Sequence, residues 1–423
     1  MNNNMPDGGA PDGERSGVLG PLVAGVSLAG TAAFWTLNHF SPALSWHVLY
    51  LLSEVVLISV VIWQACDPFA DAAQWVGRTF GLPGSVRGAT LDAIASSMPE
   101  LFSGIFFVTV AVAAAGDSTA AILEAGAEGY GATIATCAGS AVYNMILIPA
   151  FCAIVISFYR TQRPTIDVED EVLARDGLWF VVCQMVLILF LFQDKMQWWM
   201  AIAFIVIYGI YIVHLYRDTK VFQRSQQTGS DPPKVTDNDD DAPDSAGILF
   251  GYRDIPLNRV SAALIIVVST CVAAAACYFL VEATREAAQS LGVPTFFVAV
   301  ILAAAASSVP DTFMSIGSAM RGDDSGAVSN AFGSSIFDIC ICLSIPLLVN
   351  SYLTGWEPVS MLQDGKPIAG LVGLRILLVV LTVITLAIIW HRRQLTRNKA
   401  FVLCGLYLVF IGYAVFGSLG IGV

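Results

Sequence analysis

Two acidic residues, Glu100 and Asp311, each stand directly after a proline inside a long apolar stretch of this 423-residue chain. Proline lacks a backbone N–H and clashes with the carbonyl group four residues earlier, so it frees the carbonyls of Ala95 and Ala306. An unpaired charge at the centre of a membrane costs at least about 2.5 kcal/mol, so both acids require a cation or a proton beside them. The pattern therefore predicts a cation-binding centre, with protonated structural acids as the alternative.

Further oxygen ligands lie at helical spacing around these acids. They are Ser96, Ser97, Ser307 and Ser308 one turn before the acids, and Ser140, Asn144, Ser334 and Asp338 in two later segments. Carboxylate, carbonyl and hydroxyl oxygens suit calcium and alkali cations, whereas zinc or copper would recruit imidazole or thiolate groups. Three carboxylates would balance one divalent and one monovalent ion, or three monovalent ions, unless they share a proton. The serines could instead bond back to their own helices.

The two acids belong to an internal repeat. LDAIASSMPELF (91–102) matches LAAAASSVPDTF (302–313) at an offset of 211, and GSAVYN (139–144) matches GSSIFD (333–338) at an offset of 194. The first copy therefore carries 17 extra residues between its two motifs. We expect these residues in an outside loop near GDSTAAILEAGAEGYG.

Other candidate residues are weaker. Asp92 has Ala303 at its repeat position, so it lines an inner entrance or serves the structure. Glu54 has no counterpart in the repeat, which favours a buried polar contact. The 9 cysteines form no CxxC pair and the 4 histidines are scattered, so the sequence does not indicate a zinc site. The cysteine side chains are expected to pack in the apolar core as small hydrophobic residues.

The composition describes a membrane protein. The chain is 56% hydrophobic and 13% charged with a mean hydropathy of +0.71, and its net charge of −12 argues against a nucleic-acid partner. Windows of about 20 apolar residues are long enough to cross a bilayer as helices. Eleven such candidates run over 17–37, 47–66, 82–112, 130–157, 177–194, 196–216, 257–281, 294–320, 326–349, 368–390 and 400–420.

The repeated motifs fall in spans that lie five apart, and an odd separation inverts one copy relative to the other. The predicted fold is an all-α membrane protein with 10 core transmembrane helices as two inverted five-helix repeats, over 47–216 and 257–423, plus an extra N-terminal helix. Residues 17–37 are that helix or a cleaved signal, and residues 1–16 read as a disordered tail. Pro99 and Pro310 break the third and eighth spans into half-helices.

The basic residues predict the orientation. With a cytoplasmic N-terminus, Lys195, Arg285, Lys366 and Arg375 lie outside and the other 17 of the 21 Lys and Arg residues lie inside. The C-terminus is then outside, in the plasma membrane or a bacterial inner membrane. Residues 217–256 form an acidic cytoplasmic linker, whose NDDD run (238–241) reads as a solvated tract rather than a calcium site.

With SSMPELF and GSAVYNM in one half, and SSVPDTF and GSSIFDI in the other, the chain resembles the sodium/calcium exchangers of the calcium/cation antiporter superfamily. GSAVYN and SIFDI look most like the potassium-dependent branch, whereas SVPDTF also looks like the potassium-independent one. The resemblance implies alternating-access antiport of calcium against sodium, with or without potassium, and no enzymatic activity or resident cofactor.

Carried over by position, the resemblance assigns calcium coordination to Glu100 and Asp311. It assigns the remaining two positions around the ion-binding centre to Asn144 and Asp338. It places the sodium-binding hydroxyls on Ser96, Ser97, Ser307, Ser308, Ser140 and Ser334. The expected partners are calcium and sodium ions, potassium or protons, and the lipid bilayer. The chain departs from the family in having Ala95 and Ala306 before the paired serines, where the family carries glycine.

Three other functions compete with this interpretation. Proton-coupled antiport of calcium or another divalent ion would use the same scaffold, with Glu100 or Asp311 as the proton carrier. An intramembrane aspartyl hydrolase would also need paired carboxylates, but the chain has no GxGD motif. A passive channel or an ion-sensing receptor would lack flux coupling. Apolar outer helices such as 400–420 could face lipid or a second subunit.

Overall fold

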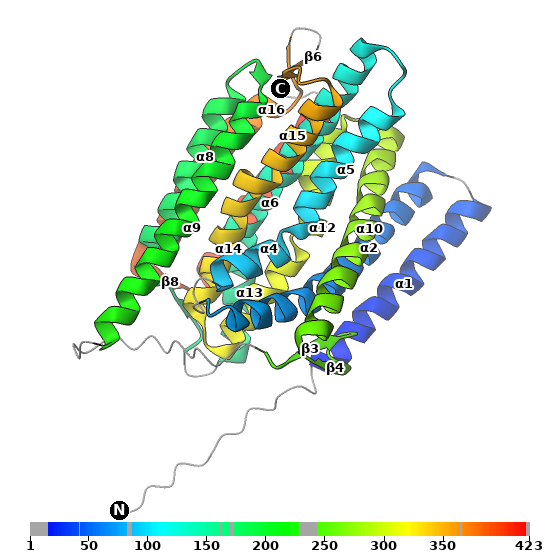
Figure 1. Cartoon of the computed structure of the whole chain (residues 1–423). Coiled ribbons are helices and arrows are strands. Elements are labelled where there is room, and N and C mark those ends of the chain that lie inside the picture. Colours follow the sequence, from blue (N-terminus) through cyan, green and yellow to red (C-terminus); the bar gives the residue numbers. More distant parts are fainter. Residues whose placement is uncertain are drawn as a thin grey trace, which may run out of the picture.

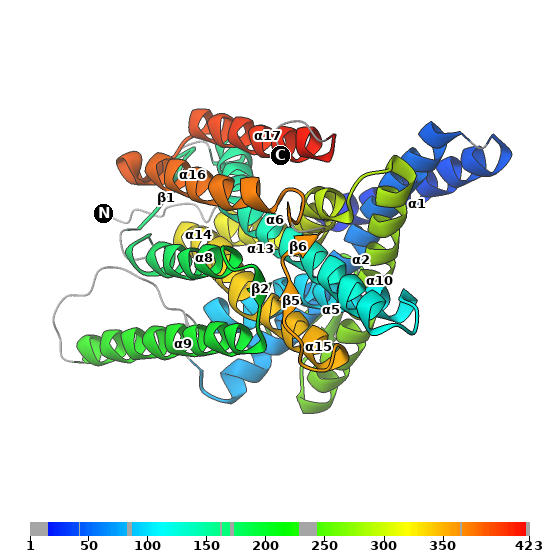
Figure 2. The ribbon, with the colours of Figure 1, turned by 90° about the horizontal axis from the view of Figure 1, so that it is seen from above.

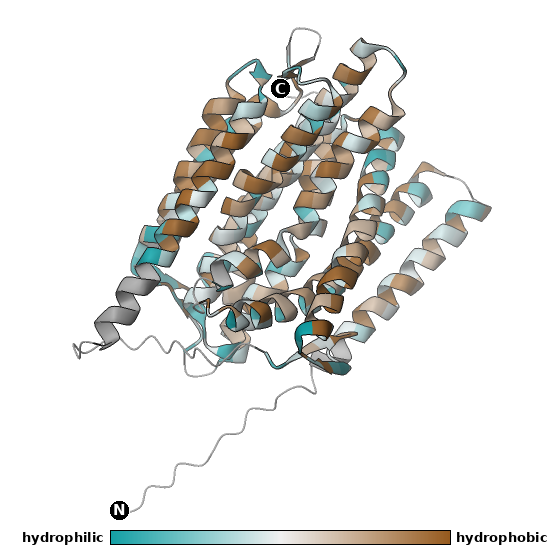
Figure 3. Ribbon diagram, viewed as in Figure 1, coloured by the Kyte–Doolittle hydropathy of each residue, from teal (hydrophilic) through white to brown (hydrophobic). Residues whose placement is uncertain are grey.

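The computed structural model describes residues 16–41, 43–82, 87–160, 163–169, 173–227, 243–363 and 366–419. Within these residues, ten helices are long and apolar enough to cross a membrane, and the bent pair Thr90–Ser96 and Met98–Ala114 brings the number to eleven. The tail before Ser16 and residues 228–242 of the predicted linker lie outside the described residues. Hydrophobic residues run along the helices of the bundle, and hydrophilic residues are frequent at its ends (Figure 3).

One extra helix and five spans make up the first half of the chain. Its elements are α1 (Ser16–Phe40), α2 (Leu44–Thr79), the π-helix η1 (Gly88–Asp92), α4 (Ala93–Ser96), α5 (Met98–Ala114), α6 (Thr119–Tyr159), β1 (Ile166–Asp167), the π-helix η2 (Leu173–Gly177), α8 (Leu178–Leu191), β2 (Lys195–Met196) and α9 (Trp198–Gln227). Helix α1 packs along α2 at the edge of the bundle (Figure 2), and much of it is exposed.

Five further spans follow a hairpin of β3 (Ser245–Ile248) and β4 (Arg253–Pro256). The elements of this half are α10 (Arg259–Leu291), α11 (Thr295–Val298), the π-helix η3 (Ala299–Ala303), α12 (Ala304–Ser307), α13 (Val309–Arg321), α14 (Asp324–Phe337), the π-helix η4 (Asp338–Cys342), α15 (Ser344–Leu353), β5 (Val359–Ser360), β6 (Leu362–Gln363), β7 (Lys366–Pro367), α16 (Leu371–Trp390), the 3-10 turn η5 (His391–Arg393), β8 (Gln394–Leu395) and α17 (Arg397–Ser418). The predicted all-helical membrane fold is therefore confirmed.

The two halves run in opposite directions through the bundle. From breaks near its middle, α5 runs to one end and α13 to the other (Figure 1). The start of α1 and the end of α17 also lie at opposite ends, as an odd number of spans requires. Both helices are interrupted at a serine, Ser97 with φ −93° and ψ 8° and Ser308 with φ −83° and ψ 3°. The chain bends by 48° at the first break, whereas Thr295–Arg321 passes through the second break as one span. The similar dihedrals follow from the shared proline two residues later, which disrupts the helical hydrogen bonding.

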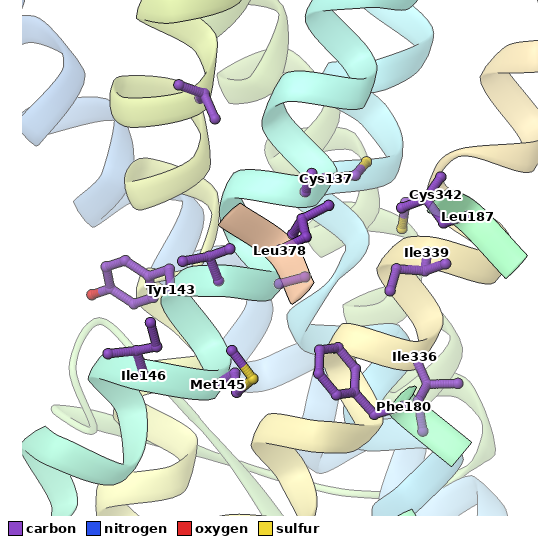
Figure 4. Packing of buried hydrophobic residues seen from close by; sticks show 14 of the residues in the cluster. Cys137, Tyr143, Met145, Ile146, Phe180, Leu187, Ile336, Ile339, Cys342 and Leu378 are labelled. Carbon is purple, nitrogen blue, oxygen red and sulfur yellow. The ribbon is translucent and has the colours of Figure 1, made fainter. Parts of the chain in front are cut away.

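Helix α6 crosses the centre of the bundle and is the most buried element of the first half. Its glycines allow close approach, since a Cβ on Gly139 would lie 2.5 Å from the Val300 carbonyl oxygen. Side chains from α6, α8, α14, η4 and α16 gather into one apolar cluster around it (Figure 4). The site helices are therefore held by packing on several sides.

Two short antiparallel ladders join the halves. Strand β1 pairs with β8, and β2 pairs with β5. The first ladder connects the segment after α6 with the turn between α16 and α17, the last two helices of the second half. The second ladder connects the segment after α15 with the turn between α8 and α9, the last two helices of the first half.

Three segments differ from the sequence expectations. The 17 extra residues were expected in a loop, but α6 already begins at Thr119, because Gly129 lets it pack directly on the backbone of α5 at Phe107. Helix α9 continues to Gln227, and β3 and β4 occupy the end of the predicted linker. The backbone N–H groups of Gly247 and Phe250 donate to Asp71 and Gln64 of α2, which fixes this hairpin on the bundle.

Candidate cation-binding centre

The two acids that follow the prolines lie at the start of facing half-helices. Glu100 is in the first turn of α5 and Asp311 in the first turn of α13, and both are fully buried. The free N–H groups and the dipole at a helix N-terminus stabilise negative charge there. The breaks at Ser97 and Ser308 thus place both carboxylates where the backbone partly offsets the cost of burying them.

Helix α6 connects the two acids through Ser140 and Asn144. The Ser140 hydroxyl lies 3.1 Å from Oε1 of Glu100 and 2.8 Å from Oδ2 of Asp338. The Asn144 amide donates to Oδ2 of Asp311 over 3.0 Å. Residues of the first half therefore contact acids of both halves.

The second half supplies the matching contacts. The Ser334 hydroxyl donates to Oδ1 of Asp311 over 2.6 Å and lies 3.2 Å from the Ser96 hydroxyl. The Ser308 hydroxyl lies 2.9 Å from Ser140 and 3.5 Å from Oε1 of Glu100. Nδ2 of Asn144 also lies 3.4 Å from the Ser140 hydroxyl, which links these contacts across the two halves. Eight of the ten predicted site residues are thus joined in one network: Glu100, Asp311, Asp338, Asn144, Ser96, Ser140, Ser308 and Ser334.

The remaining two, Ser97 and Ser307, line the same centre without joining the network through a hydrogen bond. Ser307 donates to the carbonyl of Ala304 over 3.2 Å, which is the back-bonding alternative for a membrane serine. Its oxygen still lies close to Glu100. The Ser97 hydroxyl is buried without a hydrogen-bond partner and lies close to Asp338. All ten predicted residues are fully buried.

The network has more acceptors than protons. Ser140 has one hydroxyl proton, yet its oxygen contacts Glu100, Ser308 and Asp338. Oε2 of Glu100, Oδ1 of Asp338 and Oδ1 of Asn144 are buried, and none of them has a hydrogen-bond partner among the described residues. Buried oxygens of this kind are normally satisfied by protein groups, water or ions, so this cluster of acceptors can take up protons or cations.

The hydrogen bonds to the three carboxylates come from serine hydroxyls and the Asn144 amide. The chain contains no Lys, Arg or His between residues 93 and 114, 119 and 159, or 324 and 353. Among the described residues, no three His, Cys, Asp or Glu side chains converge as one metal-binding group. A cation bound here would therefore take part of its shell from serine, asparagine and backbone oxygens.

The carboxylates of Asp92 and Glu54 lie apart from this network, and the backbone carbonyl of Asp92 accepts from the Ser96 hydroxyl over 2.8 Å. Both carboxylate oxygens of Asp92 accept from Nε2 of Gln74 at 2.8 Å, on the side of the break where α2 passes. Glu54 lies beside Tyr50 on its own helix.

Sequence reasoning missed two polar residues that extend the centre, Ser315 and Asn330. Ser315 lies four residues after Asp311 and Asn330 lies four residues before Ser334, so helical spacing alone could have found both. Nδ2 of Asn330 donates to Oγ of Ser315 over 2.9 Å and approaches the Asp311 carbonyl oxygen at 3.5 Å. The thiols of Cys137 and Cys342 also approach Asp338, but we assign them no ligand role.

Comparison with known proteins decides the family. The model of the family described as "Sodium/calcium exchanger protein" matches residues 50–217 and 261–416, which is most of the chain and both of its halves. The chain belongs to the sodium/calcium exchanger protein family. The resemblance noted in the motifs is therefore confirmed for both halves of the bundle, and helix α1 lies outside the matched residues.

Curated relatives of the exchanger are distant. Human sodium/potassium/calcium exchanger 3 is 26% identical over 166 residues, which is 39% of this chain and 22% of the relative. Human sodium/potassium/calcium exchanger 5 is 22% identical over 393 residues, covering 75% of this chain and 74% of the relative. The aligned part thus spans about a fifth of the first relative and about three quarters of the second.

Solved structures share the exchanger fold. A structure of the H+/Ca2+ exchanger CAX aligns with a TM-score of 0.61 at 14% identity and covers 95% of this chain and 92% of its own. A structure of the sodium-calcium exchanger NCX_Mj aligns with a TM-score of 0.51 at 16% identity, covering 86% and 99%. At these identities the likeness establishes the fold of the exchanger alone.

Proposed function

We propose that this exchanger is an antiporter that moves calcium against sodium, with or without potassium, by alternating access across the membrane. The observation that carries the proposal is the buried network around Glu100 and Asp311, whose carboxylate, serine and asparagine oxygens outnumber the available protons. Calcium takes six to eight oxygen ligands and alkali cations accept neutral oxygens, so this shell fits both ions.

Competition for one centre provides the coupling. The three carboxylates Glu100, Asp311 and Asp338 can be neutralised by one divalent plus one monovalent ion or by three monovalent ions. Because the same oxygens serve either set, one set must leave before the other binds. The inverted halves give the centre a route to each face of the membrane.

We assign potassium to the neighbourhood of Asp338. This acid stands where the first repeat has Asn144, so it adds one negative charge beyond the pair formed by Glu100 and Asp311. The curated relatives named above are sodium/potassium/calcium exchangers, which supports a potassium ion here.

We place the N-terminus and the linker in the cytoplasm and the C-terminus outside, because 17 of the 21 Lys and Arg residues then lie inside. The protein would act in the plasma membrane or a bacterial inner membrane, with no enzymatic activity and no resident cofactor. The transported ions are its partners.

The deciding experiment measures calcium flux in proteoliposomes of the purified protein under a sodium gradient, a proton gradient or neither, each with and without potassium. We expect uptake only with the sodium gradient, and loss of that uptake in Glu100→Gln. The Glu54→Gln variant is the matched control, because that acid lies outside the network, and it should transport normally. Flux driven by protons alone would replace the proposal with proton-coupled antiport, and flux indifferent to every gradient would indicate a channel.

A further inference from the structure

The two half-helices that leave the centre differ in the residues they present. On α13, Ser315 and Ser318 continue the face of Asp311 toward the end of the bundle where α1 begins. On α5, the position that corresponds to Ser315 is Gly104, and the buried residues Val108 and Ala111 follow it. Ser103 is the one buried polar side chain within the first turn beyond Glu100 among the described residues of α5. The repeat position of Ser315 therefore carries a hydroxyl on α13 and no side chain on α5.

Asn330 lies beside Ser315. Its amide Nδ2 donates to Ser315 and points toward the Asp311 carbonyl, and both of these partners are acceptors. The opposite amide orientation would bring its oxygen against the Asp311 carbonyl, so the contacts select the observed one. Oδ1 of Asn330 is left buried with no hydrogen-bond partner.

The oxygens available at this point are neutral. Oδ1 of Asn330 and Oγ of Ser315 lie beyond the carboxylate of Asp311, one helical turn toward the end of the bundle. Calcium sites need several oxygens with carboxylates among them, whereas a monovalent ion can be held briefly by a few neutral oxygens. The pair therefore suits sodium better than calcium.

We propose that Asn330 and Ser315 form a relay site that holds a sodium ion between the Asp311 centre and the cytoplasmic face. The site rests on the proposed function, and it gives sodium an intermediate binding step on the cytoplasmic side of the centre. In the first repeat, Thr136 occupies the position of Asn330, and its hydroxyl donates to the carbonyl of its own helix at Ala132.

The test compares sodium dependence from the two faces in proteoliposomes of known orientation. Loss of one neutral ligand in Asn330→Ala or Ser315→Ala should raise the half-saturating sodium concentration at the cytoplasmic face about fivefold. The value at the outer face should stay unchanged. Ser315→Thr keeps the hydroxyl and should behave as wild type, and Thr136→Val is the matched control on the outer side.

The outcomes separate the relay from the proposed function. Equal shifts in the half-saturating sodium concentration at both faces would mean that the substitutions distort the whole centre. No shift at either face would mean that no relay exists. Either result overturns the relay, while sodium-driven flux in the wild type still upholds the antiport. A wild type without sodium-driven flux overturns both. Should Asn330→Ala fail to fold, Ser315→Ala removes only one buried oxygen and gives the same readout.

Discussion

At the scale of single residues, Ser140 contacts acids of both halves. Its hydroxyl contacts Glu100 from its own half and Asp338 and Ser308 from the other. A single proton cannot serve all three, so a cation bound at this oxygen, as proposed, would change the environment of both carboxylates at once. Ion binding beside one repeat would then alter the affinity of the other.

Asp338 carries the first prediction. Asp338→Asn removes the third negative charge while keeping the shape of the side chain, so potassium should lose its effect on calcium flux. We expect potassium stimulation to fall about tenfold, as for loss of a charged ligand, with sodium-driven flux still measurable. Calcium flux against potassium concentration checks this.

Ser344→Ala is the control for that substitution, since Ser344 is buried near η4 but donates to the backbone at Cys340. It should keep the potassium response of the wild type. An unchanged potassium response in Asp338→Asn would show that the potassium site lies elsewhere.

At the scale of elements, α6 must pass very close to the broken helix of the second half. A Cβ on Gly139 would lie 2.5 Å from the Val300 carbonyl oxygen and 2.8 Å from Cβ of Ala304. Backbone atoms cannot move aside as a flexible side chain can, so α6 itself would have to shift. That shift would displace Ser140, the next residue.

Gly139→Ala should therefore destabilise the protein by about 1–3 kcal/mol, the usual cost of overpacking a core. Thermal unfolding of the purified protein measures this. Gly209→Ala on α9 is the matched control, because a Cβ there meets nothing within 4 Å. It should be neutral or stabilising, as alanine favours helices over glycine by about 1 kcal/mol. Equal melting temperatures for the two variants would contradict the packing argument.

The spans could be predicted from the sequence because a bilayer demands about 20 apolar residues for each helix. The ends of α2 and α6 could not. Helix α2 continues to Thr79 through polar residues whose partners, Gly247 and Phe250, lie far along the chain. The residues before Tyr130 resemble a loop in their glycine content, yet Gly129 is the point at which α6 packs on α5.

The site was predictable to a similar degree. Recurrence in two copies marks Glu100 and Asp311 directly, and the second motif marks Ser140 and Ser334. Asn330 breaks the symmetry of the repeat, so a search for matching residues passes over it. The sharing of one proton among several oxygens depends on distances that no spacing along the chain reveals.

At the scale of the whole molecule, the two ends of the bundle carry different turns. The turn between α5 and α6 lies at one end, and the β3–β4 hairpin lies at the other, where α1 begins (Figure 1). With the proposed orientation, these ends face the outside and the cytoplasm respectively.

Cysteine labelling with an impermeant maleimide tests this orientation. Asp117→Cys in the exposed α5–α6 turn should react only from outside, and Tyr252→Cys, 84% exposed at the hairpin, only from the cytoplasm. The wild type is the control, since its exposed Cys271 lies within the α10 span. Labelling of both variants from the same side would contradict the inverted arrangement.

The two short ladders between the halves have a further consequence. Strand β1 follows α6 and pairs with the turn before α17, while β5 follows α15 and pairs with the turn before α9. Exchanging the halves turns one ladder into the other, so the contact is self-complementary, like an isologous interface in a symmetric dimer. Consider a five-helix chain that inserts into the membrane in both orientations. Two oppositely inserted copies of it would already form both ladders between them. Fusion of its gene to a second copy would therefore have needed no new backbone contact between the two halves.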